Sequence, residues 1–327
     1  MDQNKPTPEQ LEQSTKIVAA MRAEIAKAVV GQTDVVDQVI VALLAAGHVL
    51  VEGVPGLGKT LLVRALAKTF AGTYSRIQFT PDLMPADVTG HTLYDQAARE
   101  FVTRRGPVFA NLLLADEINR APAKTQAALL EVMQEGQVTI EGRSETLAPP
   151  FMVLATQNPI EQEGTYALPE AQLDRFLLKV RIDYPGAEEE ARMVRQVTLG
   201  QVGDRLNVDA VATLVNPASV LALQTITASL AVDDRVLDYA VRLARGTRNW
   251  AGVAAGAGPR GGIALTRAAR AAALLAGRDF VTPDDVKSMA LPALRHRVTP
   301  APELEIEGQS SDMILKSLIE RVEAPRK

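Results

Sequence analysis

A glycine-rich segment that ends in lysine and threonine carries the clearest chemistry in this sequence. Residues Gly53–Thr60 read Gly-Val-Pro-Gly-Leu-Gly-Lys-Thr and match the phosphate-loop pattern G-x-x-x-x-G-K-[ST]. Glycines let successive backbone N–H groups turn toward phosphate oxygens, and the start of the following helix adds partial positive charge. We expect Lys59 to reach the β- and γ-phosphates of a nucleotide and Thr60 to bind Mg²⁺. A glycine-rich turn without function is the alternative, but it does not require the Lys-Thr pair. The residues expected to bind the nucleotide here are Gly53, Val54, Pro55, Gly56, Leu57, Gly58, Lys59, Thr60 and Leu61.

Two adjacent carboxylates, Asp116 and Glu117, follow the apolar run Leu112–Ala115. Open α/β sheets bind ligands at the carboxyl ends of their strands, so this pair is expected beside the phosphates. Asp116 would hold Mg²⁺ through water, and Glu117 would orient and deprotonate the water that attacks the nucleotide. Alternatively, the pair only caps the next helix. The phosphate loop earlier in the chain favours the catalytic interpretation.

Short β-like runs alternate with helical patterns as far as about Tyr184. This alternation predicts parallel βαβ units, hence an α/β fold with a doubly wound parallel sheet. Hairpin patterns at about Val88–Thr103 and Gly136–Leu147 interrupt it. The predicted strands are His48–Glu52, Arg76–Phe79, Leu112–Ala115, Phe151–Thr156 and Leu177–Ile182.

Helical patterns occupy both ends of the chain. Thr7, Pro8 and Gln10 predict the capped start of a helix that runs to about Val29. After the break at Pro185-Gly186, only helical patterns follow. We therefore predict two domains: an α/β nucleotide-binding domain over 1–184, with the N-terminal helix and both hairpins, and a small all-α domain over 185–327.

Composition excludes several other kinds of site. The chain has 327 residues, which exceeds the roughly 100–200 residues of one typical domain. It has no cysteine, and its three histidines lack metal-ligand spacing, so thiol catalysis, disulfides and Cys-ligated metals are excluded. The net charge of −4 gives no overall attraction to nucleic acid. The N-terminus is polar, and the longest apolar run is too short for a membrane span, so we predict a cytoplasmic location.

Four motifs, in this order along the chain, resemble those of the MoxR family of AAA+ ATPases, in the helix-2-insert branch. The resemblance covers about residues 30 to 300 and implies an AAA+ core with a helical lid, ATP and Mg²⁺ as cofactors, and ATP hydrolysis. The motifs are Gly53–Thr60, Asp116-Glu-Ile-Asn-Arg120, Ala155-Thr-Gln-Asn-Pro159 and Leu168-Pro-Glu-Ala-Gln-Leu-Asp-Arg-Phe176.

The last two motifs supply further catalytic candidates by resemblance. Asn158 resembles the sensor 1 position, where an amide would bind the γ-phosphate and the attacking water. Arg175 resembles the arginine finger, which a short helix starting at Pro169 and Glu170 would direct into the neighbouring subunit. The alternatives are an ordinary Asn-Pro turn and a surface salt bridge.

Three further positions carry weaker resemblance. Gly31 and Gln32 resemble the segment that contacts adenine, although Gly31 alone would also fit a helix end. Arg260, in a glycine-rich loop before a helical run, resembles sensor 2 of the lid; an incidental loop arginine is the alternative. Arg120 would face the subunit interface or the pore, or simply the surface of a helix.

The two hairpins resemble the inserts of this branch, which point toward the centre of a ring, although ordinary surface hairpins would have the same sequence pattern. His91 in the first insert is expected to be a solvated loop residue. The basic triplet 295–297 is too short for a nucleic-acid site without interleaved aromatic residues.

The predicted function is that of a MoxR-type ATPase ring, with six subunits by family resemblance, that remodels or activates a partner protein. ATP and Mg²⁺ would bind between core and lid, and Arg175 of the next subunit would complete the site. Family resemblance suggests partners with von Willebrand factor A domains. A nucleic-acid motor and a metal-chelatase motor subunit are the alternatives.

Overall fold

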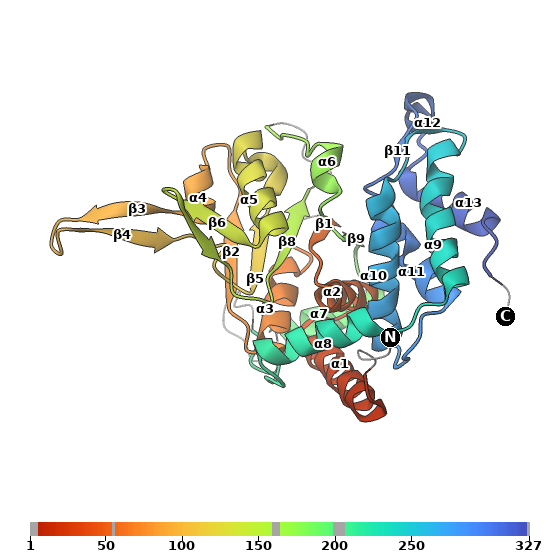
Figure 1. Ribbon diagram of the computed structural model, residues 1–327, viewed down its shortest axis with the longest axis horizontal. Coiled ribbons are helices and arrows are strands. Elements are labelled where there is room, and N and C mark those ends of the chain that lie inside the picture. The colour runs from red at the N-terminus through yellow and green to blue at the C-terminus, as the bar shows by residue number, and fades with distance from the viewer. Residues whose placement is uncertain (1–5, 54–55, 159–163, 199–206, 326–327) are drawn as a thin grey trace.

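The computed structural model describes residues 6–53, 56–158, 164–198 and 207–325. An α/β part built on one parallel sheet lies beside a group of helices formed by the C-terminal part of the chain (Figure 1). None of the helices in these ranges is long and apolar enough to cross a membrane.

Five parallel strands form the central sheet, in the order β2-β5-β8-β1-β9. Helices cover both of its faces, as an all-parallel sheet requires, and the strands β5 and β8 are buried along almost their whole length. Each predicted strand is present with its ends shifted by a residue or two, and the predicted α/β class is confirmed. The strands are β1 Val49–Gly53, β2 Tyr74–Gln78, β5 Leu112–Asp116, β8 Met152–Gln157 and β9 Leu178–Ile182.

Successive residues of each strand point to opposite faces of the sheet and enter different apolar clusters. Leu112 and Leu114 of β5 join the cluster that holds α1 to α3, whereas Leu113 and Ala115 join the cluster that holds α5. Because all five strands run parallel, their carboxyl ends lie at one edge of the sheet. The candidate site is built at that edge. These helices are α1 Pro8–Ala28, α2 Thr33–Leu44, α3 Lys59–Thr69 and α5 Ala123–Glu135.

Two antiparallel hairpins leave the sheet, as the sequence predicts. The strands β3 (Gly90–Asp95) and β4 (Glu100–Arg105) follow the short helix α4 (Pro85–Thr89) and project far from the body (Figure 1). The strands β6 (Gln137–Ile140) and β7 (Arg143–Thr146) form the shorter hairpin. Arg105 Nε lies 2.9 Å from Glu145 Oε2, so an ion pair joins the two hairpins at their bases.

The C-terminal part is mainly helical. Its helices α9, α10, α11 and α13 pack on one another, and α11 also contacts the edge strand β9. A small antiparallel pair, β10 with β11, accompanies them. The elements are α9 Asp234–Gly246, β10 Val253–Ala255, α10 Pro259–Leu275, α11 Pro283–Leu294, β11 Thr299–Pro300, α12 Pro302–Ile306 and α13 Ser311–Arg321, with a short 3₁₀ turn at Thr247–Asn249. A second 3₁₀ turn, Ile118–Arg120, follows β5 in the α/β part.

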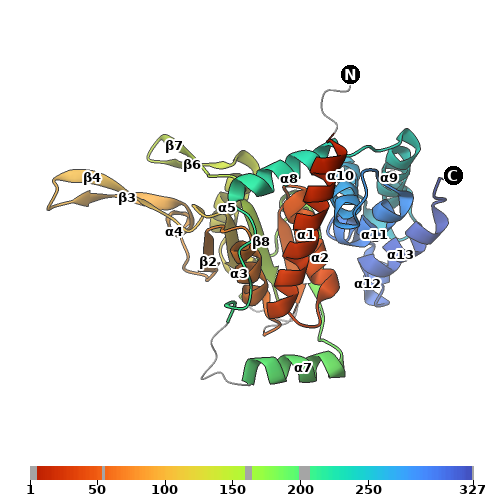
Figure 2. The ribbon, with the colours of Figure 1, turned by 90° about the horizontal axis from the view of Figure 1, so that it is seen from below.

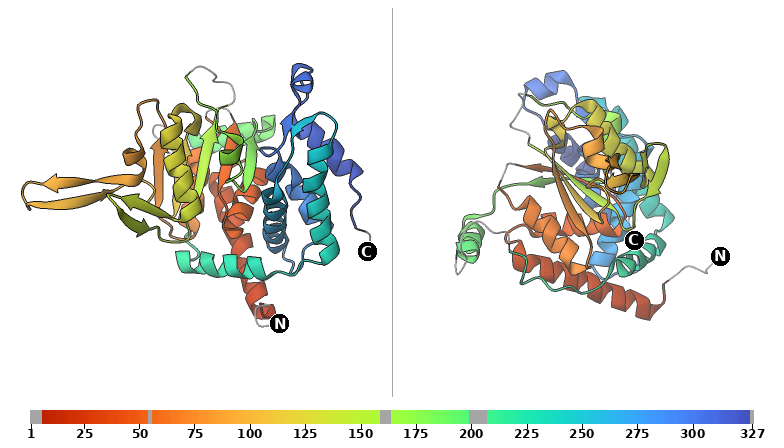
Figure 3. Two further views of the ribbon diagram at one scale, coloured as in Figure 1. Left: turned by 45° about the horizontal axis from the view of Figure 1, so that its top comes forward. Right: turned by 90° about the vertical axis from the view of Figure 1, so that its left-hand side faces the viewer.

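Two helices lie between these parts in sequence. The helix α7 (Ala187–Thr198) stands apart from the body in Figure 2, whereas α8 (Pro217–Ser229) contacts α1, α2 and α10 and runs from the α/β part to the lid helices in Figure 3. The predicted domain boundary at 184/185 falls between β9 and α7, and the division of the chain into 1–184 and 185–327 stays a prediction.

Candidate nucleotide site

A cavity of about 360 Å³ lies at the carboxyl edge of the sheet, where the loop after β1 meets the ends of β2, β5 and β8. It brings together the phosphate loop, the carboxylate pair and Asn158, as the sequence predicts. The lining residues are Gly56, Gly58, Lys59, Thr60, Leu61, Arg76, Gln78, Asp116, Glu117, Thr156 and Asn158.

The phosphate loop has the backbone geometry that its glycines allow. Gly56 and Gly58 have φ of +84° and +75°, a left-handed conformation that other residues adopt only with strain. Gly58 is the N-cap of α3, so the free N–H groups of that helix begin at the cavity. Val54 and Pro55 lie outside the described residues. This geometry fits the binding of an anion at the start of α3.

The Lys59 ammonium is held close to the loop that carries it. Its Nζ donates a 2.6 Å hydrogen bond to the carbonyl oxygen of Gly53. Burial lowers the Lys59 pKa, and the negative charges of Asp116 and Glu117 oppose that shift. Phosphate oxygens are stronger acceptors than the Gly53 carbonyl, so the lysine can turn to them when they enter.

The adenine candidates Gly31 and Gln32 lie next to this loop. The Gln32 side-chain Nε2 donates to the Leu57 carbonyl at 3.0 Å, which connects the start of α2 to the phosphate loop. Gly31 has φ of +75°, and a Cβ there would lie 2.9 Å from the Cβ of Glu189 in α7. The segment that precedes α2 is therefore next to the loop and to α7, although neither Gly31 nor Gln32 lines the cavity.

Asp116 is held on both sides by residues of neighbouring strands. Its Oδ1 accepts a 2.6 Å hydrogen bond from the Thr156 hydroxyl of β8. Its Oδ2 lies 2.6 Å from Nη2 of Arg76 on β2. The Arg76 side chain is 47% exposed, so it can move away when a cation and phosphates enter. These contacts place the Asp116 carboxylate in the cavity.

Glu117 has a backbone conformation that few non-glycine residues adopt, with φ of +56°. Its N–H donates to the Thr156 hydroxyl at 2.9 Å, which stabilises the turn after β5. Its Oε2 accepts from Gln78 Nε2 at 2.8 Å and lies 3.1 Å from Arg120 Nε. Gln78 and Arg120 thus orient the Glu117 carboxylate inside the cavity.

The donor set of the cavity fits Mg²⁺ with a bound nucleotide. Mg²⁺ binds hard oxygen donors and keeps several waters, so one or two protein groups are enough when phosphates supply the rest. The Thr60 hydroxyl and the Asp116 carboxylate both line the cavity. Nowhere among the described residues is there a group of three or more His, Cys, Asp or Glu side chains that could hold a metal by itself.

Arg175 and Arg260 lie elsewhere, on a second cavity of about 320 Å³. Arg175 follows the short helix α6 (Glu170–Leu173), and its Nη1 donates to the Leu130 carbonyl of α5 at 2.6 Å. Arg260 Nε lies 3.9 Å from Asp174 Oδ2. None of the described residues that line this cavity also lines the nucleotide cavity.

The binding of ATP between core and lid stays a prediction. Every described residue that lines the nucleotide cavity itself belongs to 56–158. Arg260 is at the start of α10, and α10 and α11 pack against α2 and the edge strand β9. The lid therefore lies beside the edge of the sheet, and its Arg260 is next to the Arg175 segment rather than over the phosphate loop.

Sequence reasoning missed Arg76 and Gln78 as parts of the site. Both lie on β2, where the register pairs Gln78 with Asp116 and Arg76 with Leu114 of β5. Polar residues at every second position of a short strand also occur when one face of the strand is simply exposed to solvent. The sequence pattern of β2 therefore does not distinguish a site from a solvated face. Only the strand order makes these side chains neighbours of the carboxylates.

Residues 48–178 match the family described as "ATPase family associated with various cellular activities (AAA)", and residues 245–317 match the AAA lid domain. The chain is 44% identical over 316 residues to the chaperone MoxR1 of Mycobacterium tuberculosis, an alignment that covers 93% of this chain and 81% of that protein. It is 34% identical over 331 residues to the protein MoxR of Methylorubrum extorquens, covering 94% of this chain and 95% of that one.

A solved structure agrees with these similarities. A Cytophaga hutchinsonii protein described as a "putative ATPase" superimposes with a TM-score of 0.90, is 40% identical, and matches 97% of this chain and 98% of its own. The phosphate loop and the Asp-Glu pair line one cavity, in the fold that the AAA match implies. The chain belongs to the MoxR family of AAA+ ATPases.

Proposed function

We propose that copies of this chain assemble head to tail into a ring that hydrolyses ATP and thereby remodels or activates a partner protein. One observation supports the ring above all: Arg175 and Arg260 line a cavity that shares no described residue with the nucleotide cavity. A guanidinium near the γ-phosphate offsets the charge that develops there during phosphoryl transfer. A second copy could supply both arginines to the nucleotide of the first.

Within one subunit, the residues of the nucleotide cavity take the roles that their chemistry suits. Lys59 and the N–H groups at the start of α3 bind the phosphates, and Thr60 and Asp116 hold Mg²⁺, which neutralises charge on the β- and γ-phosphates when bound. Glu117 accepts a proton from the attacking water, and Asn158 positions that water and the γ-phosphate.

The assembly and its partners are proposed from the family. A head-to-tail interface closes into a ring when its rotation permits, and six subunits is what the resemblance suggests. A relative is named a chaperone, which supports a protein partner; a von Willebrand factor A domain partner and a cytoplasmic location remain predictions.

A subunit-mixing experiment tests the arginine assignment. Arg175→Ala should lower turnover by about 10³–10⁵-fold and leave ATP binding nearly intact. Lys59→Ala should bind ATP more weakly, by about tenfold to a hundredfold, but keep Arg175 and Arg260. Rings that contain both variants should hydrolyse ATP faster than the sum of the separate variants, because an intact site then meets an intact Arg175. If mixed rings form and show only the summed activity, Arg175 does not act in trans and Arg120 becomes the next candidate.

A further inference from the structure

The basic triplet at the end of α11 is buried between the lid and the segment that carries Arg175. The Arg297 side chain is 4% exposed, and His296 is 7% exposed. Burial and the positive charge of Arg297 lower the pKa of His296 well below its ordinary value, so the imidazole is neutral. The buried Arg297 guanidinium therefore carries the positive charge, and each of its N–H groups needs an acceptor.

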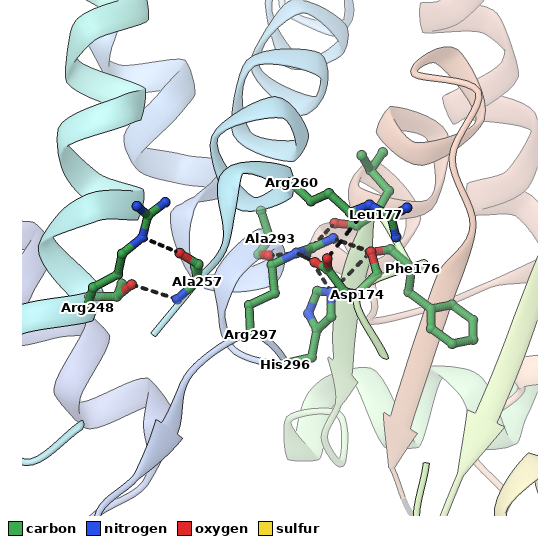
Figure 4. Close-up of polar contacts among 10 residues, drawn as sticks. Asp174, Phe176, Leu177, Arg248, Ala257, Arg260, Ala293, His296 and Arg297 are labelled. Atoms are coloured by element: carbon green, nitrogen blue, oxygen red, sulfur yellow. Dashed lines mark hydrogen bonds and ion pairs between the residues drawn. The ribbon is translucent and has the colours of Figure 1, made fainter. Parts of the chain in front are cut away.

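Arg297 finds those acceptors mainly on Asp174, Phe176 and Leu177 (Figure 4), the neighbours of Arg175 in the sequence. Its Nε donates to Asp174 Oδ1 at 2.6 Å, and its Nη2 donates to the carbonyls of Asp174 at 3.1 Å and Phe176 at 2.7 Å. Its Nη1 donates to the carbonyl of Leu177 at 3.3 Å and to the carbonyl of Ala293. All five N–H groups of the guanidinium therefore have acceptors.

These bonds place Arg175 between two residues that Arg297 binds, Asp174 and Phe176. The Phe176 side chain is fully buried, which anchors the same segment from the other side. The Asp174 carboxylate also attracts Arg260, whose Nε lies 3.9 Å from Oδ2. One carboxylate and one buried guanidinium thus connect the two arginines that line the second cavity.

We propose that Arg297 is a positioning residue that fixes the lid to segment 174–177, so that Arg175 and Arg260 meet the next subunit as one rigid unit. This inference rests on the proposed function, in which those arginines act in trans. It replaces the expectation that the lid moves against its own core: the lid and segment 174–177 move together, and hydrolysis changes the contact with the neighbouring subunit.

Conservative variants test this role. Arg297→Lys keeps the charge but offers donors from one nitrogen in place of a planar fork, so it cannot serve the carbonyls of 174, 176 and 177 together. Asp174→Asn removes the carboxylate charge that attracts both Arg297 and Arg260. Each should lower turnover by about 10–100-fold, the effect of a small misplacement of a catalytic group, with an unchanged ATP dissociation constant.

Arg248→Lys is the matched control. Arg248 Nε donates to the Ala257 carbonyl at 2.8 Å, so it is also a lid guanidinium that binds a backbone carbonyl (Figure 4). Among the described residues, Arg248 makes no hydrogen bond or ion pair with segment 174–177, and its replacement should leave turnover near the parental rate. A loss equal to that of Arg297→Lys would mean that general loosening of the lid explains both effects, which would overturn the proposal.

Subunit mixing separates positioning from damage to the whole subunit. An Arg297→Lys subunit keeps its own nucleotide site and is impaired only as a donor of arginines. Mixed with Lys59→Ala it should recover turnover, and mixed with Arg175→Ala it should not. The proposal is overturned if assembled rings recover turnover with neither Lys59→Ala nor Arg175→Ala subunits, or if Arg297→Lys alone keeps the parental turnover. If Arg297→Lys does not fold, Asp174→Asn takes its place in the experiment. If Arg175→Ala and Lys59→Ala themselves fail to complement, the trans assignment in the proposed function is what has failed.

Discussion

Lys59 and Glu117 lie in one cavity but contribute to different steps. The Lys59 ammonium would contact phosphates in the ground state, so Lys59→Ala should weaken ATP binding by about tenfold to a hundredfold, the loss of one charge-assisted contact. Glu117 acts on water, so Glu117→Gln should bind ATP normally and lower turnover by about 10²–10⁴-fold. Equilibrium binding of a fluorescent ATP analogue and phosphate release measure the two effects. Parental turnover in Glu117→Gln would show that the base is another group.

His48 makes the stability of the fold depend on pH. Its Nδ1 accepts from the Val153 N–H and its Nε2 donates to the Met133 carbonyl, both at 3.0 Å, so the neutral ring is the bonded form. Burial, aided slightly by the charge of Arg267, lowers its pKa from 6.5 to about 4. The unfolded chain therefore takes up a proton between pH 6.5 and 4 that the folded chain does not. The folded state loses about 3 kcal/mol from His48 as the pH falls through this range, and little of that loss occurs above about pH 7.

Comparison with His48→Gln isolates this contribution, because glutamine offers an acceptor and a donor without titrating. Urea unfolding at pH 7 and pH 4.5 should show a smaller drop in unfolding free energy for the variant than for the parental chain. Carboxylates titrate in both chains and cancel in the difference. Equal drops would mean that His48 is not buried in its neutral form.

At the scale of elements, the hairpin β3–β4 exposes apolar side chains on both faces. Tyr94 and Phe101 are a cross-strand pair with ring centroids 5.2 Å apart, and they are 53% and 76% exposed. Leu93 and Val102 are exposed on the opposite face. Exposed apolar clusters of this kind mark surfaces that contact other molecules. No residue of this hairpin is among the described residues that line either cavity.

We therefore predict that the double variant Tyr94→Ser with Phe101→Ser keeps the parental melting temperature and basal turnover. Exposed substitutions away from packed contacts change stability by only about 0.5 kcal/mol. A partner captured by Glu117→Gln rings in the presence of ATP should be lost when these two substitutions are added. Thr92→Ser, on the same hairpin, is the control. A fall in basal turnover would instead place the hairpin in ring assembly.

At the scale of the whole molecule, charge argues against a nucleic-acid motor. The net charge is −4, and Arg105 at the base of the long hairpin is paired with Glu145. Duplex and single-stranded DNA should therefore leave the ATPase rate unchanged at about 0.15 M salt, where weak phosphate contacts are screened. Phosphate release with and without DNA measures this. Stimulation of several-fold would make DNA translocation the leading function.

Local patterns in the sequence were enough to predict the five strands of the sheet, both hairpins and half of the site, but not the strand pair β10–β11 in the C-terminal part. The phosphate loop, the Asp-Glu pair and Asn158 each follow a strand, and parallel strands end at one edge, so their meeting in one cavity follows from the strand pattern. The capping box of Thr7 with Gln10 and both hairpins are likewise set by short-range spacing, and all are present. Such features depend on residues a few positions apart.

Strand order, register and the packing of the lid were decided only by the tertiary structure. Arg76 reaches Asp116 because β2 and β5 are neighbours in the sheet. No short sequence pattern predicts which strands are neighbours. In the sequence, Arg297 is one member of a short basic triplet, and in the structure it is buried against residues 174–177, more than 100 positions earlier. A guanidinium can be solvated by water or by carbonyls, and the residue type is the same in both cases. Only the docking of α11 on the edge of the sheet determines which of these occurs, and with it where Arg175 and Arg260 point.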